Sequence, residues 1–173
     1  ADVVGATSII GNFVFTGRGW PEAPFIAVRL NGGAWNRIRL ADQVTLASGL
    51  NASTTYKLEV VFDGWNQTEH LWNTQRKFTI KSLQVGSGSI SYTNRKKNVL
   101  FIGDSITAGT KTLSSSDLAA GNSHVNTYAK MLGDKMGVNV IPSAFPGTKV
   151  MDSFTRTNFN QVTNNTQAGN LNI

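Results

Sequence analysis

The stretch Asn98-Val-Leu-Phe-Ile-Gly-Asp-Ser-Ile-Thr-Ala-Gly109 decides the fold of this chain. It opens with a continuous apolar run and closes with small and polar residues. Such a run is typical of a strand buried on both faces of a parallel sheet, because neither face of that strand meets solvent. We therefore predict that a strand ends at Gly103 and that an α/β region begins near Lys97.

The sequence after this stretch predicts a helix and a second strand. Apolar residues recur at helical spacing between Ser123 and Met136, with Ser123 as the expected N-cap and Gly137 as the terminating glycine. A strand is predicted at 138–141, and strand, helix and strand together make a right-handed parallel βαβ unit. A further helix is predicted at 151–162. These elements are too few for a three-layer sheet, so we expect the sequence to be part of a longer domain.

The first half of the chain has a different pattern, of short strands separated by turn residues. Strands are predicted at 8–16, 25–30, 34–40, 44–47, 54–62, 75–80 and 89–92. Glycine and asparagine punctuate them at 17–19, 31–33 and 63–64, where tight turns need a positive φ. From Tyr56 to Phe62, apolar residues alternate with Lys57 and Glu59, as they do in a half-buried antiparallel strand.

These patterns predict two domains. Residues 1–92 form an all-β sandwich or jelly roll, 93–97 form a linker, and 98–173 form the start of a three-layer, flavodoxin-like α/β domain with a parallel sheet. Hydrophobic residues make up 40% of the chain and charged residues only 15%. A lightly charged surface rich in Asn, Thr, Ser and Gly suits a secreted, cell-surface or virion-borne protein. A first residue other than Met fits a removed signal peptide or a shortened chain equally well.

The charge pattern and the rare residue types exclude several function classes. The formal net charge is +6, yet the basic residues are scattered, and the single dense group, 95–97, is explained by a solvated linker. We predict no nucleic-acid partner. No apolar run approaches the roughly 20 residues that cross a bilayer. The chain has no cysteine, and its two histidines lack metal-ligand spacing, so no metal site is predicted. The oligomeric state is not indicated.

Ser105 is the candidate nucleophile. It follows a predicted parallel strand, at the sheet edge where ligands bind in open α/β folds. Its backbone N–H can point to the place where a substrate carbonyl oxygen develops charge, and its hydroxyl needs a base, usually a histidine, within hydrogen-bond reach. Gly103 and Asp104 are structural residues of the turn, since adjacent side chains point apart and Asp104 can hydrogen-bond the backbone. Gly-Asp-Ser also occurs in ordinary turns and helix caps, which is the alternative reading.

Residues 103–109 resemble the first sequence block of the GDSL lipases and esterases, also called SGNH hydrolases, with Ile106 in place of the more usual Leu. The resemblance covers roughly residues 97–160. Residues 138–148 resemble the second block, although Phe145 and Pro146 replace residues that are usually small or hydroxylated. The resemblance implies that Ser105 is the nucleophile and that the N–H groups of Ser105 and Gly147 form part of the oxyanion hole.

Two further blocks of this family do not occur before Ile173. One is a Gly-x-Asn-Asp run that supplies an oxyanion-hole asparagine, and the other is the Asp-x-x-His run that supplies the base. His70 and His124 stand in no such run, and surface or capping roles are expected for both. The resemblance therefore implies that the catalytic histidine lies beyond residue 173.

A β-rich module ahead of an SGNH domain resembles the two-domain carbohydrate acetyl esterases. The resemblance implies a serine esterase that removes acetyl groups from a carbohydrate, or acts on another small ester, through an acyl-enzyme and without a cofactor. Trp20 and Trp65, in predicted loops, are candidates for stacking on sugar rings, although a tryptophan in a small sandwich is more often part of the core. The alternative is a non-catalytic glycan-binding or structural protein of a cell surface or phage tail that carries an incomplete SGNH domain.

Overall fold

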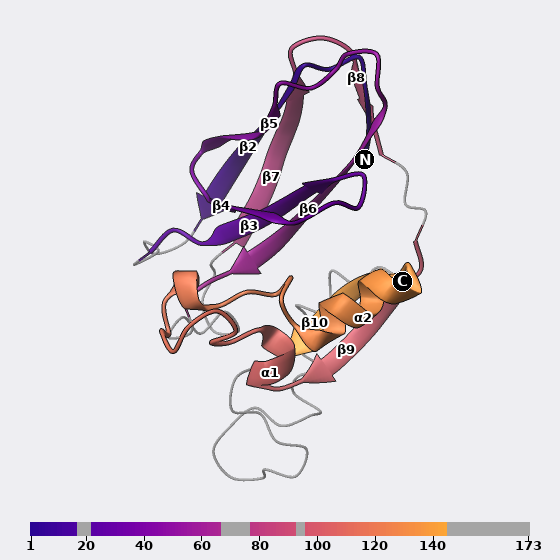
Figure 1. Cartoon of the computed structure of the whole chain (residues 1–173). Coiled ribbons are helices and arrows are strands. Elements are labelled where there is room, and N and C mark those ends of the chain that lie inside the picture. Colours follow the sequence, from indigo (N-terminus) through magenta and orange to yellow (C-terminus); the bar gives the residue numbers. More distant parts are fainter. Residues whose placement is uncertain (17–21, 67–76, 93–95, 145–173) are drawn as a thin grey trace, which may run out of the picture. The chain divides into compact units, whose positions relative to one another are not determined.

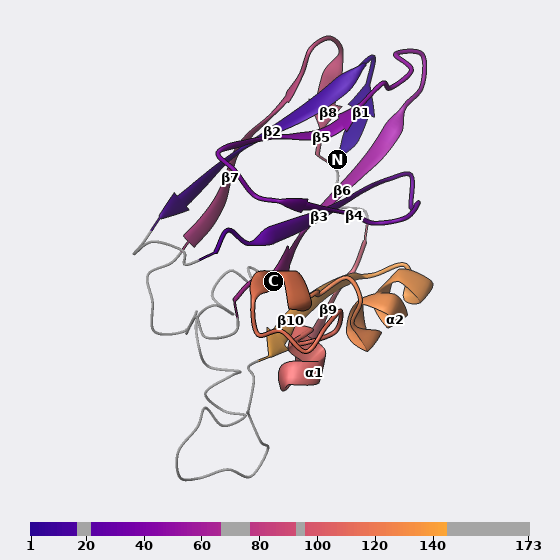
Figure 2. The same cartoon turned by 60° about the vertical axis from the view of Figure 1, so that its left-hand side comes forward.

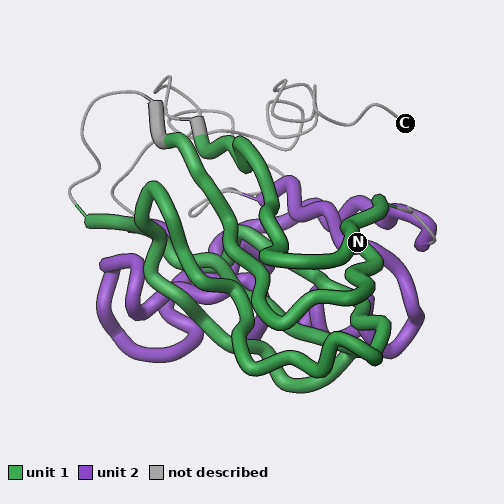
Figure 3. Tube along the Cα trace, turned by 90° about the horizontal axis from the view of Figure 1, so that it is seen from above, with its two compact units in different colours: residues 1–63, 74–95 green, residues 64–73, 96–173 purple. Residues whose placement is uncertain are grey.

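The computed structural model describes residues 1–16, 22–66, 77–92 and 96–144 (Figure 1). The chain divides into two compact units, residues 1–63 with 74–95 and residues 64–73 with 96–173, shown in green and purple in Figure 3. We call these the β unit and the α/β unit. The second unit thus includes a segment from the middle of the first half of the sequence. The predicted boundaries at 92 and 98 stay a prediction.

The β unit consists of two sheets (Figures 1 and 2). The five-stranded sheet has the order β4 (Asn36–Arg39), β3 (Phe25–Leu30), β6 (Tyr56–Gly64), β1 (Asp2–Val4) and β8 (Ser89–Ser91). The three-stranded sheet has the order β5 (Gln43–Ser48), β2 (Ser8–Thr16) and β7 (Lys77–Val85). β2 pairs antiparallel with both of its neighbours, as β1 does with β6 and β8.

The core of the β unit collects the alternate apolar positions of both sheets. Ile9 and Phe13 of the smaller sheet are buried in one cluster with Ile26 and Leu58 of the larger sheet. The ring of Phe78 stacks on Phe13, with centroids 5.5 Å apart. In the predicted strand 54–62, the alternating residues Tyr56, Leu58, Val60 and Phe62 all join this cluster, so the period-two pattern identified the buried face correctly.

The strand predictions succeed where the apolar alternation is long. The strands at 8–16 and 25–30 are confirmed at both ends, and Asn31 and Gly32 have the positive φ values, 53° and 71°, expected between β3 and β4. The turn predicted at Asp63 and Gly64 is wrong, because β6 continues through both residues. Asp63 is fully buried there and forms an ion pair with Arg37. β1 was missed, since three residues are too few for a periodic signal.

The described part of the α/β unit begins a parallel sheet. It contains β9 (Asn98–Gly103), α1 (Ser105–Ala108), the 3₁₀ turn η1 (Ala119–Gly121), α2 (Tyr128–Met136) and β10 (Asn139–Ala144). β9 and β10 pair in parallel, which confirms the predicted βαβ unit. The chain therefore combines a β-rich part with the start of an α/β part. The helix predicted at 151–162 lies outside the described residues.

The predicted start of α2 is wrong by four residues. Thr127, not Ser123, is the N-cap, and its hydroxyl oxygen accepts the N–H of Lys130 at 3.1 Å. Ser123 lies outside the helix, and its N–H donates to the Gly109 oxygen at 2.9 Å. The predicted end is confirmed, because Gly137 adopts the left-handed conformation at the C-cap with a φ of 66°. Among the described residues, no helix is long and apolar enough to cross a membrane.

Candidate active site

The structure places Ser105 at the carboxyl end of the parallel pair. β9 ends at Gly103, which is opposite Ala144, the last residue of β10. After a single intervening residue the chain turns into α1, and Ser105 is the first residue of this helix. Its side chain is half-buried. The carboxyl edge of a parallel sheet is where open α/β folds bind their ligands. Ser105 is therefore at the site where a nucleophile would meet a substrate.

Asp104 is the N-cap of α1. Its carboxylate oxygen Oδ1 accepts the N–H of Ile106 at 3.0 Å. An N-cap side chain of this kind satisfies one of the backbone donors that a helix start leaves open. Among the described residues, no hydrogen bond joins Asp104 to the N–H of Ser105, the donor that an oxyanion hole would use. Asp104 thus orders the turn and leaves the Ser105 N–H to other acceptors.

Two glycines enclose the α1 turn. A Cβ on Gly103 would lie 2.1 Å from the Thr107 hydroxyl oxygen, so no larger residue fits between β9 and α1. Gly109 has a φ of 86°, and a Cβ there would lie 2.3 Å from the Ser123 oxygen. The N–H of Gly109 donates to the Ser105 oxygen at 3.0 Å and closes the turn. Close packing on both sides therefore fixes the backbone that carries Ser105.

Side-chain contacts tie α1 to α2. The hydroxyls of Thr107 and Tyr128 share a hydrogen bond of 2.8 Å, and Thr107 is buried. The Tyr128 ring also meets Phe101 of β9 edge-on, with centroids 6.4 Å apart. Sequence patterns did not identify this link, because neither residue belongs to a motif that requires the other. The helix that follows the candidate nucleophile is thus anchored to the next helix.

Asn122 is buried, and its side chain links two segments of the α/β unit. Its Nδ2 donates to the backbone oxygen of Trp65 at 2.6 Å, and its Oδ1 accepts the N–H of Lys111 at 2.7 Å. These bonds join the segment after β6 to the segment after α1. The indole of Trp65, a candidate sugar platform, is half-buried. The Trp65 backbone therefore belongs to the same unit as Ser105. That the Trp65 indole stacks on a sugar ring stays a prediction.

Of the remaining candidate residues, the structure describes only His124. The surface or capping role expected for His124 is wrong, because the residue is only 4% exposed and lies ahead of the true N-cap. Its carbonyl oxygen accepts both the N–H and the hydroxyl of Thr127, at 3.0 Å and 2.8 Å. Gly147, Trp20 and His70 lie outside the described residues. Within the described ranges, no three His, Asp or Glu side chains gather as metal ligands.

Solved structures with a similar fold include two carbohydrate esterases. One is an acetyl xylan esterase from the rumen bacterium Butyrivibrio proteoclasticus, with a TM-score of 0.70 and 17% identity over 87% of this chain and 41% of that chain. The other is a family-two carbohydrate esterase from Clostridium thermocellum in complex with cellohexaose, with a TM-score of 0.70 and 15% identity over 91% of this chain and 48% of that chain. This chain therefore shares its fold with a part of each of these two carbohydrate esterases.

A less similar structure is a salicylyl-acyltransferase from a tetracycline biosynthetic pathway, with a TM-score of 0.57 and 15% identity over 84% of this chain and 38% of that chain. This chain spans less than half the length of each of these three structures. No family model and no curated protein sequence matches it. At these identities the comparisons establish the fold, and they agree with the resemblance that the sequence around Ser105 carries.

Proposed function

We propose that this chain carries the nucleophile of a serine esterase that deacetylates a carbohydrate. Ser105 is the nucleophile, and the N–H groups of Ser105 and Gly147 contribute to the oxyanion hole. The catalytic histidine and the oxyanion-hole asparagine come from sequence beyond residue 173. In the complete protein a jelly-roll module precedes a three-layer SGNH domain, and the enzyme works outside the cell, at the cell surface or on a virion.

One observation carries this proposal. Ser105 starts a helix at the carboxyl end of a parallel strand, and the preceding Asp104 caps the helix without using the N–H of Ser105. Support also comes from the fold, which carbohydrate esterases and an acyltransferase share. Both classes of protein transfer acyl groups, a reaction that needs an exposed nucleophile beside preorganised N–H donors.

The proposed reaction has the steps of a serine esterase. The Ser105 oxygen attacks the acetyl carbon while the histidine base takes the hydroxyl proton, and the negative charge that develops on the carbonyl oxygen meets the backbone donors. The bond between the acetyl carbon and the sugar oxygen then breaks, and the histidine returns the proton to that oxygen. Water attacks the acetyl-serine in the same way and releases acetate. The groups named here need no cofactor for these steps.

A matched pair of serine variants tests the proposal in the complete protein. Ser105→Ala removes the attacking oxygen, so we expect kcat on an acetylated chromogenic ester to fall by about 10³-fold or more. Ser115→Ala is the control, because Ser115 is exposed in the same unit. It should leave kcat unchanged. Activity that survives Ser105→Ala would exclude Ser105 as the nucleophile.

The second candidate function is a non-catalytic glycan-binding or structural protein. The absence of an Asp-x-x-His run and a Gly-x-Asn-Asp run from the 173 residues favours it for this stretch of chain. The same assay separates the two functions. A complete protein that binds an acetylated oligosaccharide but releases no acetate would support the binding function, while acetate release that depends on Ser105 would support the esterase.

A further inference from the structure

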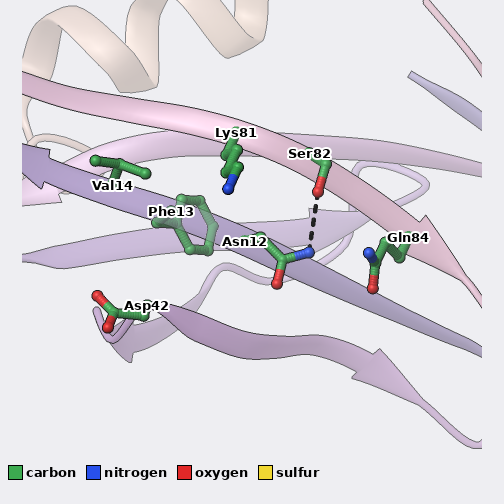
Figure 4. Close-up of a pocket in the computed structure, with 7 residues that line it drawn as sticks. All are labelled: Asn12, Phe13, Val14, Asp42, Lys81, Ser82 and Gln84. Carbon is green, nitrogen blue, oxygen red and sulfur yellow. Dashed lines mark hydrogen bonds between the residues drawn. The ribbon is translucent and has the colours of Figure 1, made fainter.

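A pocket of about 540 Å³ opens on the three-stranded sheet of the β unit (Figure 4). Asn12, Phe13 and Val14 of β2 line it from the middle strand. Lys81, Ser82 and Gln84 of β7 line it from one side, and Asp42, just before β5, lines it from the other. Its volume is in the range of small-molecule sites, which are typically about 300–1,000 Å³. All of its residues belong to one unit, the one without Ser105.

A row of polar side chains crosses all three strands at this pocket. Asn12 Nδ2 donates to the Ser82 hydroxyl oxygen at 3.0 Å, as Figure 4 shows, and Gln43 Nε2 donates to Asn12 Oδ1 at 3.0 Å. Both amides and the hydroxyl retain further donors or acceptors, because each of them can make more bonds than the row uses. The orientation of Asn12 is therefore fixed before a ligand arrives, and hydrogen-bonding capacity remains toward the pocket.

A β-bulge in β7 lies at this pocket. In the pairing of β2 with β7, Asn12 lies opposite Ser82, but the next residue, Phe13, lies opposite Ile80, so Lys81 is the extra residue. Lys81 and its neighbour Ser82 both line the pocket at this irregularity. Bulges commonly re-aim side chains in this way next to functional sites.

The charges of the pocket indicate the chemistry of its ligand. Asp42 and Lys81 carry opposite formal charges on the two sides of β2, so the pocket has no net charge. Amide and hydroxyl groups supply both donors and acceptors, and Val14 is 37% exposed and adds an apolar contact. A ligand that fits has many hydroxyl groups, no net charge and a small apolar face. A neutral sugar has these properties, and an anionic or cationic ligand does not.

We propose that this pocket binds a neutral oligosaccharide. Asn12, Ser82 and Gln84 bond its hydroxyl groups, Asp42 and Lys81 bond it from the two sides, and Val14 packs against a sugar ring. The site lies in the β unit and takes no part in ester chemistry. It stands independently of the role proposed for Ser105.

The test is an NMR titration of the 173-residue chain, following backbone amide shifts, with cellohexaose and xylohexaose as neutral probes and trigalacturonic acid as an anionic probe. We expect at least one neutral probe to give saturable shifts on β2, β7 and residue 42. Asn12→Ala and Gln84→Ala should each raise its Kd about threefold to tenfold, the value of one hydrogen bond. Asn36→Ala, an exposed asparagine of the other sheet, should leave that Kd unchanged.

Several outcomes would overturn the site. The first is that only trigalacturonic acid gives saturable shifts. The second is that neither neutral probe gives saturable shifts on β2 and β7. The third is that a neutral probe binds and both pocket variants leave its Kd unchanged. Shifts confined to residues 103–109 would place sugar binding at the candidate active site instead. Because Gln84 is exposed, its variant keeps the sheet intact even if Asn12→Ala perturbs the polar row. Ser105→Ala should leave this titration unchanged, which separates a failure here from a failure of the esterase proposal.

Discussion

At the scale of single residues, two arginines of β4 form ion pairs that differ in burial and therefore in their expected contribution to stability. Arg37 and Arg39 both lie over the ring of Phe25, 4.5 Å and 4.8 Å from its centroid. Arg37 pairs with Asp63, whose side chain is fully buried, whereas Arg39 is 49% exposed and pairs with Glu22. The side chain of Glu22 is 15% exposed, so water can reach it. Loss of the cation costs far more free energy at a fully buried carboxylate, because water cannot replace the lost partner there.

Arg37→Met and Arg39→Met should therefore differ in stability. Both replacements keep an apolar side chain near Phe25. We expect Arg37→Met to lower the free energy of unfolding of the β unit by about 3 kcal/mol or more, and Arg39→Met to lower it by about 1 kcal/mol or less. Urea denaturation followed by circular dichroism measures both. If both variants lose the same free energy of unfolding, the burial of Asp63 does not determine how much its ion pair with Arg37 contributes to stability.

The residues of the candidate site were predictable to unequal degrees. The stretch around Ser105 could be identified because the strand, the cap and the candidate nucleophile are neighbours in sequence. Asn122 could not, since its bond to Trp65 joins residues 57 positions apart and neither side of that contact carries a local signature. The fully buried Asp63 was mistaken for a turn residue for the same reason, because its partner Arg37 lies on another strand.

At the scale of elements, the α-helices α1 and α2 end on glycines with the same conformation and different surroundings. Gly109 ends α1 with a φ of 86°, and Gly137 ends α2 with a φ of 66°. A Cβ on Gly137 would meet nothing within 4 Å, whereas on Gly109 it would meet the Ser123 oxygen at 2.3 Å. Glycine is required at 137 only because the backbone is left-handed there. At 109 it is required for the same reason and also because the chain packs closely against the segment that leads to α2.

Alanine at these two positions separates the two requirements. Gly137→Ala should cost about 1 kcal/mol, the strain of a left-handed alanine. Gly109→Ala adds a backbone clash and should cost about 2 kcal/mol more. It should also lower esterase activity in the complete protein, because the N–H of Gly109 closes the turn that carries Ser105. Thermal unfolding and the chromogenic assay measure the two effects. Equal stability losses would contradict the packing argument.

Element boundaries show where sequence reasoning stops. The alternation in β2 and β3 gave correct ends, since each strand contributes residues to the buried core. The start of α2 was misplaced because Ser123 and Thr127 are both good N-cap residues, and only tertiary contact chooses between them. The N–H of Ser123 bonds the Gly109 oxygen, and the helix begins after the second candidate, Thr127.

At the scale of the whole molecule, the chain divides into two units with separate predicted tasks. The sequence predicted a β-rich part followed by the start of a parallel α/β part, and the structure has both. It did not predict that residues 64–73 belong with the second unit, because no composition change marks them. The proposed neutral-sugar site is in the β unit and the proposed nucleophile is in the α/β unit, so each can be disabled alone.

The apolar surface of the α/β unit also bears on the complete protein. Leu100 of β9 and three residues of α2, Met131, Leu132 and Met136, are exposed. Sheets of parallel strands are usually covered on both faces, and exposed apolar groups of this size commonly mark a surface that meets further structure. This fits the proposal that sequence beyond residue 173 adds to the domain and supplies the histidine and asparagine of the active site.

The central claim is that Ser105 becomes acylated during turnover. Its most direct test is mass spectrometry of the complete protein after acid quenching during turnover of 4-nitrophenyl acetate, followed by digestion. We predict the added mass of one acetyl group on the peptide that contains Ser105, and its loss in the Ser105→Ala variant. A complete protein that turns over the ester while this peptide stays unmodified, or that carries the acetyl group on another side chain, would contradict the account.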